Sequence, residues 1–389
     1  MSRKPVVLSA QDPTERGRAA VFMRLVGSYW TGGQRVLAWI LGVTLLVLVL
    51  ASVKLQALIN TWNASFFDAL EKRAQADIAP LLWQFAGYVV IAGLIMVLTV
   101  LVRMSLMVQL RRWITIAIYT HWLDSRSYVR LDRDAKGAET PEFRIADDVR
   151  LALDQLADLA VGFFTSLLLA ITFFEVLARV GGGIRLESLG GIDIPAYFLV
   201  GAILYALVLS GLTSTLGWPL IARIQRKNHL EGTFRYELMK VREEAPAIAA
   251  SGKEAQRADK LAASLEDLVR QWQRVLLWQS QVLGVASSNA VLVGVFPVIL
   301  AIPKYMTGEL TLGAVMQLAT AFVQVQMALN WIVDNFVRFA EFRASANRVG
   351  ELVTAMDGLG PDDERRLAAQ AAASAADAAL EAATAKTVS

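Results

Sequence analysis

The sequence predicts an all-α membrane protein with six transmembrane helices and long cytoplasmic helical extensions. Its 389 residues are 55% hydrophobic and 19% charged, with a mean hydropathy of +0.45. A soluble domain is about a quarter charged. Six stretches contain no Asp, Glu, Lys or Arg, and most approach the roughly 20 residues that a helix needs to cross the hydrocarbon. They are residues 36–53, 78–102, 159–174, 194–222, 275–303 and 310–333.

Each stretch extends a few residues into its flanks. The predicted spans therefore cover about 36–59, 79–108, 156–178, 195–221, 275–302 and 311–337.

The basic residues predict the orientation of these spans. Segments 109–158 and 223–274 hold 8 and 11 Lys and Arg, whereas 60–77, 179–193 and 304–309 hold 2, 2 and 1. Because Lys and Arg accumulate in cytoplasmic loops, both termini and both long loops are predicted to be cytoplasmic. The net charge of +3 then follows from topology and gives no reason to expect a nucleic acid partner.

Three regions are expected along the chain. Residues 1–34 form a cytoplasmic N-terminus, in which an apolar face from Val21 to Tyr29 predicts a helix lying in the membrane interface. A frayed lead-in to the first span is the alternative. Residues 35–350 form the transmembrane domain, and the Ala-rich tail 351–389 has too few large apolar residues to pack a core.

The two long loops read as helical hairpins, over residues 109–155 and 222–274. Helical periodicity continues into both from the preceding spans, so each projects about 30–40 Å into the cytoplasm. Pro141, with Thr140 as N-cap, begins a short helix at the first tip. Pro246 interrupts the second hairpin near its tip.

Five motifs lie within this layout. They are NTWNASFFDALEKR (60–73), LRRWITIAIYTHWLDSRSYVRL, TPEFRIADDVR, EGTFRYELMKVRE and WIVDNFVRFAEFRASANRV (331–349). In this order they resemble a subgroup of ABC exporter-type transmembrane domains. The subgroup comprises bacterial permease–ATPases related to the peroxisomal fatty-acyl transporters and to the SbmA/BacA peptide-uptake proteins.

The resemblance implies a homodimer in the bacterial inner membrane that moves peptides or similar bulky hydrophilic solutes such as cobalamin. It also implies coupling segments at the tips of the two hairpins. Their candidate residues are Arg144, Asp147, Asp148, Glu231, Arg235, Arg242 and Glu243. A solvated helix face is the alternative for each of these charges.

Two departures from the family pattern bear on the energy source. No G-x-x-x-x-G-K-[ST] or LSGGQ sequence occurs. The second coupling segment, REEAPAIAASGKE, has Glu244, Pro246, Ser251 and Lys253 where the family tends to have Asn, Glu, Tyr and Gly. Because Pro246 should break the helix at the coupling turn, we expect proton-driven transport like that of SbmA/BacA proteins. A separate ATPase subunit, moving peptides or lipid and acyl substrates, is the alternative.

Proton coupling would need carboxylates in or near the membrane. The candidates are Glu175, Asp334 and Glu341, with Arg338 beside the last two. A plain ion pair is the competing interpretation, notably for Glu175, which lies four residues before Arg179. Asp68 is expected to order the first outer loop.

Neutral polar residues within the spans are candidates to line a water-filled cavity, because unpaired polar groups in lipid are costly. They are Thr213, Ser287, Asn289, Gln317, Thr320 and Gln324. Hydrogen bonds between helices are the alternative.

The sequence predicts neither an enzyme nor a cofactor. There is no cysteine, and the two histidines, His121 and His229, lie far apart, so no metal site is indicated. The remaining alternative to a transporter is a membrane scaffold or sensor that has kept the fold.

Overall fold

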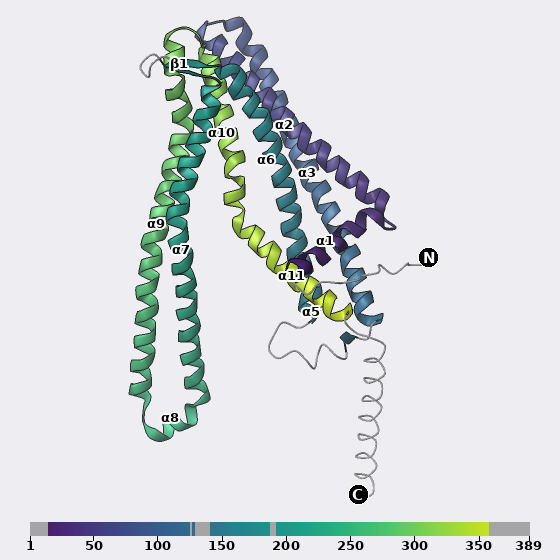
Figure 1. Ribbon diagram of the computed structural model, residues 1–389, viewed down its shortest axis with the longest axis vertical. Coiled ribbons are helices and arrows are strands. Elements are labelled where there is room, and N and C mark those ends of the chain that lie inside the picture. The colour runs from purple at the N-terminus through teal and green to yellow at the C-terminus, as the bar shows by residue number, and fades with distance from the viewer. Residues whose placement is uncertain (1–14, 125–126, 129–140, 187–191, 358–389) are drawn as a thin grey trace, which may run out of the picture. The chain divides into compact units, whose positions relative to one another are not determined.

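The computed structural model describes residues 15–124, 127–128, 141–186 and 192–357. Thr140, the chain before Glu15 and the tail beyond Asp357 lie outside them. The elements are α1 (Glu15–Thr31), α2 (Arg35–Glu71), α3 (Gln75–Asp124), α5 (Pro141–Phe143), η1 (Arg144–Asp148), α6 (Val149–Gly181), β1 (Ile184–Leu186), β2 (Ile192–Ile194), α7 (Tyr197–Glu243), α8 (Ala245–Ser251), α9 (Glu254–Met306), α10 (Leu312–Asp334) and α11 (Phe336–Asp357) (Figure 1).

Six helical segments are long and apolar enough to cross a membrane, as the charge-free stretches predicted. They are Arg35–Glu71, Gln75–Asp124, Pro141–Gly181, Tyr197–Glu243, Glu254–Met306 and Leu312–Met356. The fold is therefore all-α. The one unpredicted element is a short antiparallel pair, β1 and β2, in which Ile184 lies opposite Ile194.

The chain divides into two compact units. The first contains residues 1–54, 89–165 and 334–389, and the second contains residues 55–88 and 166–333. The helices α2, α3 and α6 each contribute to both.

The core of the first unit is built around α1. The predicted apolar face of this helix is buried, with Phe22 and Tyr29 fully so. It packs against one side of α11 and against α3, whose Ile114 and Ile118 are also fully buried. Protein therefore covers the face that the pattern assigned to the membrane interface, and burial in a core accounts for its apolar residues.

A buried ion pair joins η1 to α11 in the same unit. The side chain of Asp148 is fully buried, and Arg348 donates to it from Nε at 3.0 and 2.9 Å and from Nη2 at 2.6 Å. Nearby, Glu351 pairs with both Arg18 and Arg144 at 3.5 Å. A buried carboxylate needs such a partner, so this pair fixes the first hairpin tip to α11.

The second unit is dominated by the pair of long helices α7 and α9, which run side by side (Figure 1). They contain 47 and 53 residues, or about 70 and 80 Å of helix. Between them Gln271 is buried and donates to the carbonyl of Arg223 at 3.0 Å. Toward their other ends, the hydroxyl of Tyr205 on α7 donates to Asn289 on α9 at 2.6 Å.

The short helix α8 connects α7 and α9 (Figure 1). As expected, the chain leaves α7 just before Pro246, but it restarts at once as α8 with Pro246 in the first turn. Proline suits that position because its missing N–H has no partner there in any helix. The positive φ of 61° at Gly252 ends α8. The predicted break of the helix at Pro246 is therefore confirmed, and Pro246 also lies in the first turn of a discrete tip helix.

We expect Asp148→Asn to destabilise the protein strongly, because it leaves Arg348 without its buried counter-charge. Removing one member of a buried pair costs about 3–5 kcal/mol. Thermal unfolding of the detergent-purified protein measures this. The matched control is Asp147→Asn, whose carboxylate is 41% exposed and pairs with Arg150 one turn along. It should cost less than about 1 kcal/mol. Equal melting temperatures for the two variants would contradict the role given to Asp148.

Gly313→Ala should also lower the melting temperature. A Cβ at Gly313 would collide with the carbonyl of Ala64 and the carboxylate of Asp68, and overpacking of this kind costs about 1–3 kcal/mol. Gly294→Ala on α9 is the control, because its Cβ would meet nothing within 4 Å. If the two variants melt alike, α2 and α10 are not held as closely as described.

Candidate functional site

The C-terminal end of α2 is bonded to the first turns of α10. Asn60 is 3% exposed, and its amide donates to the carbonyl of Gln317 at 2.9 Å and to the hydroxyl of Thr320 at 2.6 Å. Further along α2, Asp68 accepts from the N–H of Gly313 at 2.8 Å and Glu71 accepts from that of Leu312 at 3.0 Å. These carboxylates satisfy free N–H groups at the start of α10 and suit the positive end of its dipole.

Asn60, Asp68 and Glu71 all belong to the motif NTWNASFFDALEKR, so this motif holds α2 against α10. The indole N–H of Trp62 adds a hydrogen bond of 2.8 Å to the carbonyl of Leu81 on α3. The sequence indicated that Asp68 orders this region, but not that it caps α10, whose Gly313 lies 245 residues later.

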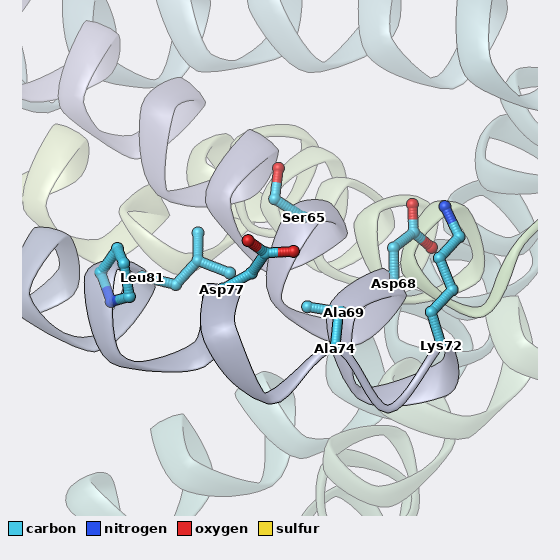
Figure 2. A pocket seen from close by; sticks show the side chains of 8 residues that line it. Ser65, Asp68, Ala69, Lys72, Ala74, Asp77 and Leu81 are labelled. Carbon is cyan, nitrogen blue, oxygen red and sulfur yellow. The ribbon is translucent and has the colours of Figure 1, made fainter.

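A hollow of about 400 Å³ lies where α2 ends and α3 begins. Figure 2 shows its lining, in which Asp77 comes from α3 and Asp68 and Lys72 come from the end of α2 and the residue after it. Ser65, one turn earlier on α2, also lines it. The hollow thus carries charges of both signs beside the apolar side chains of Ala69, Ala74, Pro80 and Leu81.

The predicted cavity-lining residues are divided in the structure. Thr320 and Asn289 take part in hydrogen bonds between helices, to Asn60 and Tyr205 respectively. Ser287 is exposed, and Thr213, Gln317 and Gln324 are half-buried. Two of these six residues therefore form the hydrogen bonds between helices that were the alternative to a cavity. The other four are exposed or half-buried.

The predicted charged candidates lie near helix ends. Glu175 and Arg179 form an exposed ion pair at 2.8 Å, one turn apart on α6. In the first unit, Glu341 accepts a hydrogen bond of 3.0 Å from Gln155. Asp334, the last residue of α10, is exposed.

Two further charges, which the sequence reasoning missed, complete a cluster in the first unit. Asp158 on α6 pairs with Arg103 on α3 and lies 4.0 Å from Arg338 on α11. Arg103 directly follows one charge-free stretch and Asp158 directly precedes the next. Opposite charges at neighbouring span boundaries were the signal that could have found them.

The first coupling segment is engaged in the first unit's own packing. Asp148 is buried against Arg348, Arg144 pairs with Glu351 at 3.5 Å, and Asp147 pairs with Arg150 at 3.3 Å.

The second coupling segment is open. Glu231 forms an exposed pair with Lys227 at 3.8 Å, while Arg235, Arg242 and Glu243 are exposed along α7. Glu244 pairs with Arg257 across the tip, which holds α8 between the two long helices.

In the described residues, no three His, Asp or Glu side chains come together as a metal site would require. The charged side chains form ion pairs and helix caps, and these contacts hold neighbouring helices together.

Comparison with known proteins agrees with this architecture. The chain matches the family described as ABC transporter transmembrane region 2 over residues 29–306. It is 26% identical over 348 residues to the inner membrane ABC transporter ATP-binding protein YddA of Escherichia coli, covering 87% of this chain and 61% of that protein.

The chain covers a smaller share of two further relatives. An uncharacterized ABC transporter ATP-binding protein of Synechocystis is 26% identical over 85% of this chain and 48% of its own length. ABC transporter D family member 2, chloroplastic, of Arabidopsis thaliana is 22% identical over 86% and 46%. The chain thus spans roughly half to three-fifths of the relatives it matches.

The family match, which covers most of the chain, agrees with the structure. The structure has six helices long enough to cross a membrane and two long helices joined by a tip helix. This multi-pass membrane protein belongs to the ABC transporter transmembrane region 2 family.

Proposed function

We propose that two copies of this chain form the membrane-spanning part of a bacterial inner-membrane transporter. It moves peptides or similarly bulky hydrophilic solutes, such as cobalamin, by alternating access. The energy comes from ATP, bound by a domain outside residues 1–389 that docks on α8. The observation that carries this proposal is α8 itself, a separate short helix at the tip of two helices of about 70 and 80 Å.

The surface of α8 suits a docking role. Ile248 is buried against the hairpin, whereas Pro246, Ala247, Ala249 and Ala250 are exposed. Small apolar side chains allow a partner to approach the backbone closely. The ion pair between Glu244 and Arg257 fixes α8 to α9, so a push on α8 would be passed along both long helices.

The relatives support ATP as the energy source, since those named above are called ATP-binding or ABC transporters. The altered coupling motif had favoured proton drive because Pro246 interrupts the helix and because Glu244, Ser251 and Lys253 depart from the family pattern. Pro246 does interrupt the helix, but the chain continues as α8, and α8 offers a surface on which an ATP-binding partner can dock.

The homodimer is supported by apolar side chains on the part of α7 and α9 that lies beyond the charge-free stretches. Tyr236, Met239, Leu265, Val269 and Trp272 are 42–50% exposed there. Lipid does not cover this region in the topology we propose, because it projects into the cytoplasm. A second copy of the hairpin would bury such a surface.

Proton drive is the second candidate. Its support is the exposed carboxylate of Asp334 at the junction of α10 and α11, and Glu341 two turns later.

The test is movement of fluorescein-labelled tetra-alanine across inner-membrane vesicles from the organism that encodes the chain. We expect movement that requires ATP and disappears when the chain is deleted. Ala249→Trp should slow it at least tenfold, because the bulky ring blocks the docking face of α8. Ala262→Trp on the shaft of α9, also exposed, should leave the rate unchanged.

Other results point elsewhere. Movement driven by an imposed pH gradient without ATP, and lost in Glu341→Gln or Asp334→Asn, would replace ATP by proton drive. Absence of movement under either condition would reject the transporter in favour of a scaffold or sensor. If both Trp variants are equally impaired, α8 is not the docking helix.

A further inference from the structure

The paired helices α7 and α9 change from apolar to charged surface at one level. The charge-free stretch of α7 stops just before Arg223, and that of α9 starts just after Arg274. The amide of Gln271 on α9 donates to the carbonyl of Arg223 at 3.0 Å, so the ends of the two stretches lie beside each other. Two independent apolar runs therefore mark the same edge of the membrane within the second unit.

Two tryptophans lie just inside this edge. Trp218 is four residues before the end of the stretch 194–222 and is 78% exposed. Trp278 is three residues after the start of the stretch 275–303 and is half-buried. Tryptophan is enriched where hydrocarbon meets the lipid head groups, because its ring is apolar and its N–H is polar. In the topology that the basic residues predict, this is the cytoplasmic edge.

Arg223 is held in position across the helix pair. The centre of its guanidinium lies 4.2 Å from the centre of the Trp278 ring, which is a favourable cation–π distance. Its Nη1 donates to the carbonyl of Pro219 at 2.9 Å. A guanidinium has five N–H donors, and among the described residues Arg223 has no ion pair that would occupy the others. The group is therefore oriented and still open to a ligand.

Two more arginines extend this site. Arg226 lies three residues after Arg223 on α7, and Arg274 lies four residues before Trp278 on α9. Residues at these spacings are neighbours on a helix surface, and both arginines are exposed. Three guanidinium groups thus gather around the stacked pair of Arg223 and Trp278.

The acidic residues of this region neutralise other cations. Glu231 pairs with Lys227 at 3.8 Å, and Asp267 pairs with Arg270. Between these acids and the charge-free stretches, neither helix carries another Asp or Glu. In the part of the chain that the structure describes, Arg223, Arg226 and Arg274 form no ion pair. The site therefore keeps three uncompensated positive charges.

We propose that Arg223, Arg226 and Arg274 bind the phosphate of an anionic phospholipid at this edge of the membrane. The planar fork of arginine matches phosphate oxygens, and the cytoplasmic leaflet carries the anionic lipids. Ile221 and Leu277, which are 50% and 62% exposed, provide apolar surface for the acyl chains next to the charges. A zwitterionic lipid fits less well, because the arginines repel its ammonium group. The inference goes beyond transport and depends on neither the solute nor the energy source.

The test is the retention of lipid by the full chain in an uncharged detergent, measured by native mass spectrometry. The protein receives equal amounts of phosphatidylglycerol and phosphatidylcholine with the same acyl chains. We expect at least tenfold more phosphatidylglycerol to be retained, because only this lipid has a net negative charge. Equal retention of the two lipids would overturn the proposal.

Substitutions locate the site. Arg226→Gln and Arg274→Gln should each weaken phosphatidylglycerol binding about fivefold, as expected for one basic residue beside an anionic lipid. Both residues are exposed, so the melting temperature should not change. The matched controls, Arg235→Gln and Arg242→Gln, remove the same charge from exposed positions of α7 farther from the apolar stretch, and lipid binding should stay as in the wild type. If all four variants weaken binding alike, net charge and not this site retains the lipid.

Two further measurements separate a lipid from other occupants. An excess of inorganic phosphate should leave the lipid bound, because phosphate has no acyl chain to contact Ile221 and Leu277. Displacement of the lipid would assign the arginines to a soluble anion. Phosphatidylglycerol should also be retained by the dimer, and retention by single copies alone would assign this surface to contact between copies. Either of these results would overturn the lipid site while leaving the transport proposal intact.

Discussion

The hydrocarbon core offers no partner to a polar group, and this constraint governs most of the molecule. Backbone groups must bond within their own segment, so every element that enters the membrane is a helix. Charges lie at the ends of the apolar stretches, where Arg103 and Asp158 pair, or beyond them, where Asp68 and Glu71 cap α10. Two buried amides form hydrogen bonds between helices, Asn60 to α10 and Gln326 to the carbonyl of Ala202.

The two hairpin tips have different structural roles, although the family pattern treats both as coupling segments. At the first tip the carboxylate of Asp148 is buried under α11, and η1 is part of a core. At the second tip α8 presents small exposed residues at the end of two long helices. In the proposed function a partner that delivers energy docks on α8, whereas η1 packs against α11.

Much of the fold could be predicted from the sequence, because hydropathy and charge report directly on the membrane. The limits were set by what a pattern cannot distinguish. The apolar face of α1 reads the same whether lipid or protein covers it, and the structure shows protein. Because Pro246 has no N–H, it interrupts one helix and also fits the first turn of the next, α8. Asp148 and Arg348 lie 200 residues apart, so no local signal reports their pairing. The first span was predicted to end near residue 59, whereas α2 continues to Glu71, because a hydropathy pattern does not report the contacts of its last turns with α10.

The central claim is that two copies of the chain enclose a water-filled space within the membrane. A cryo-electron microscopy reconstruction in lipid nanodiscs measures this most directly, because it resolves copy number, lipid and ordered water together. We expect two copies around a shared aqueous space. A single copy, or two copies with no such space between their helices, would contradict the claim.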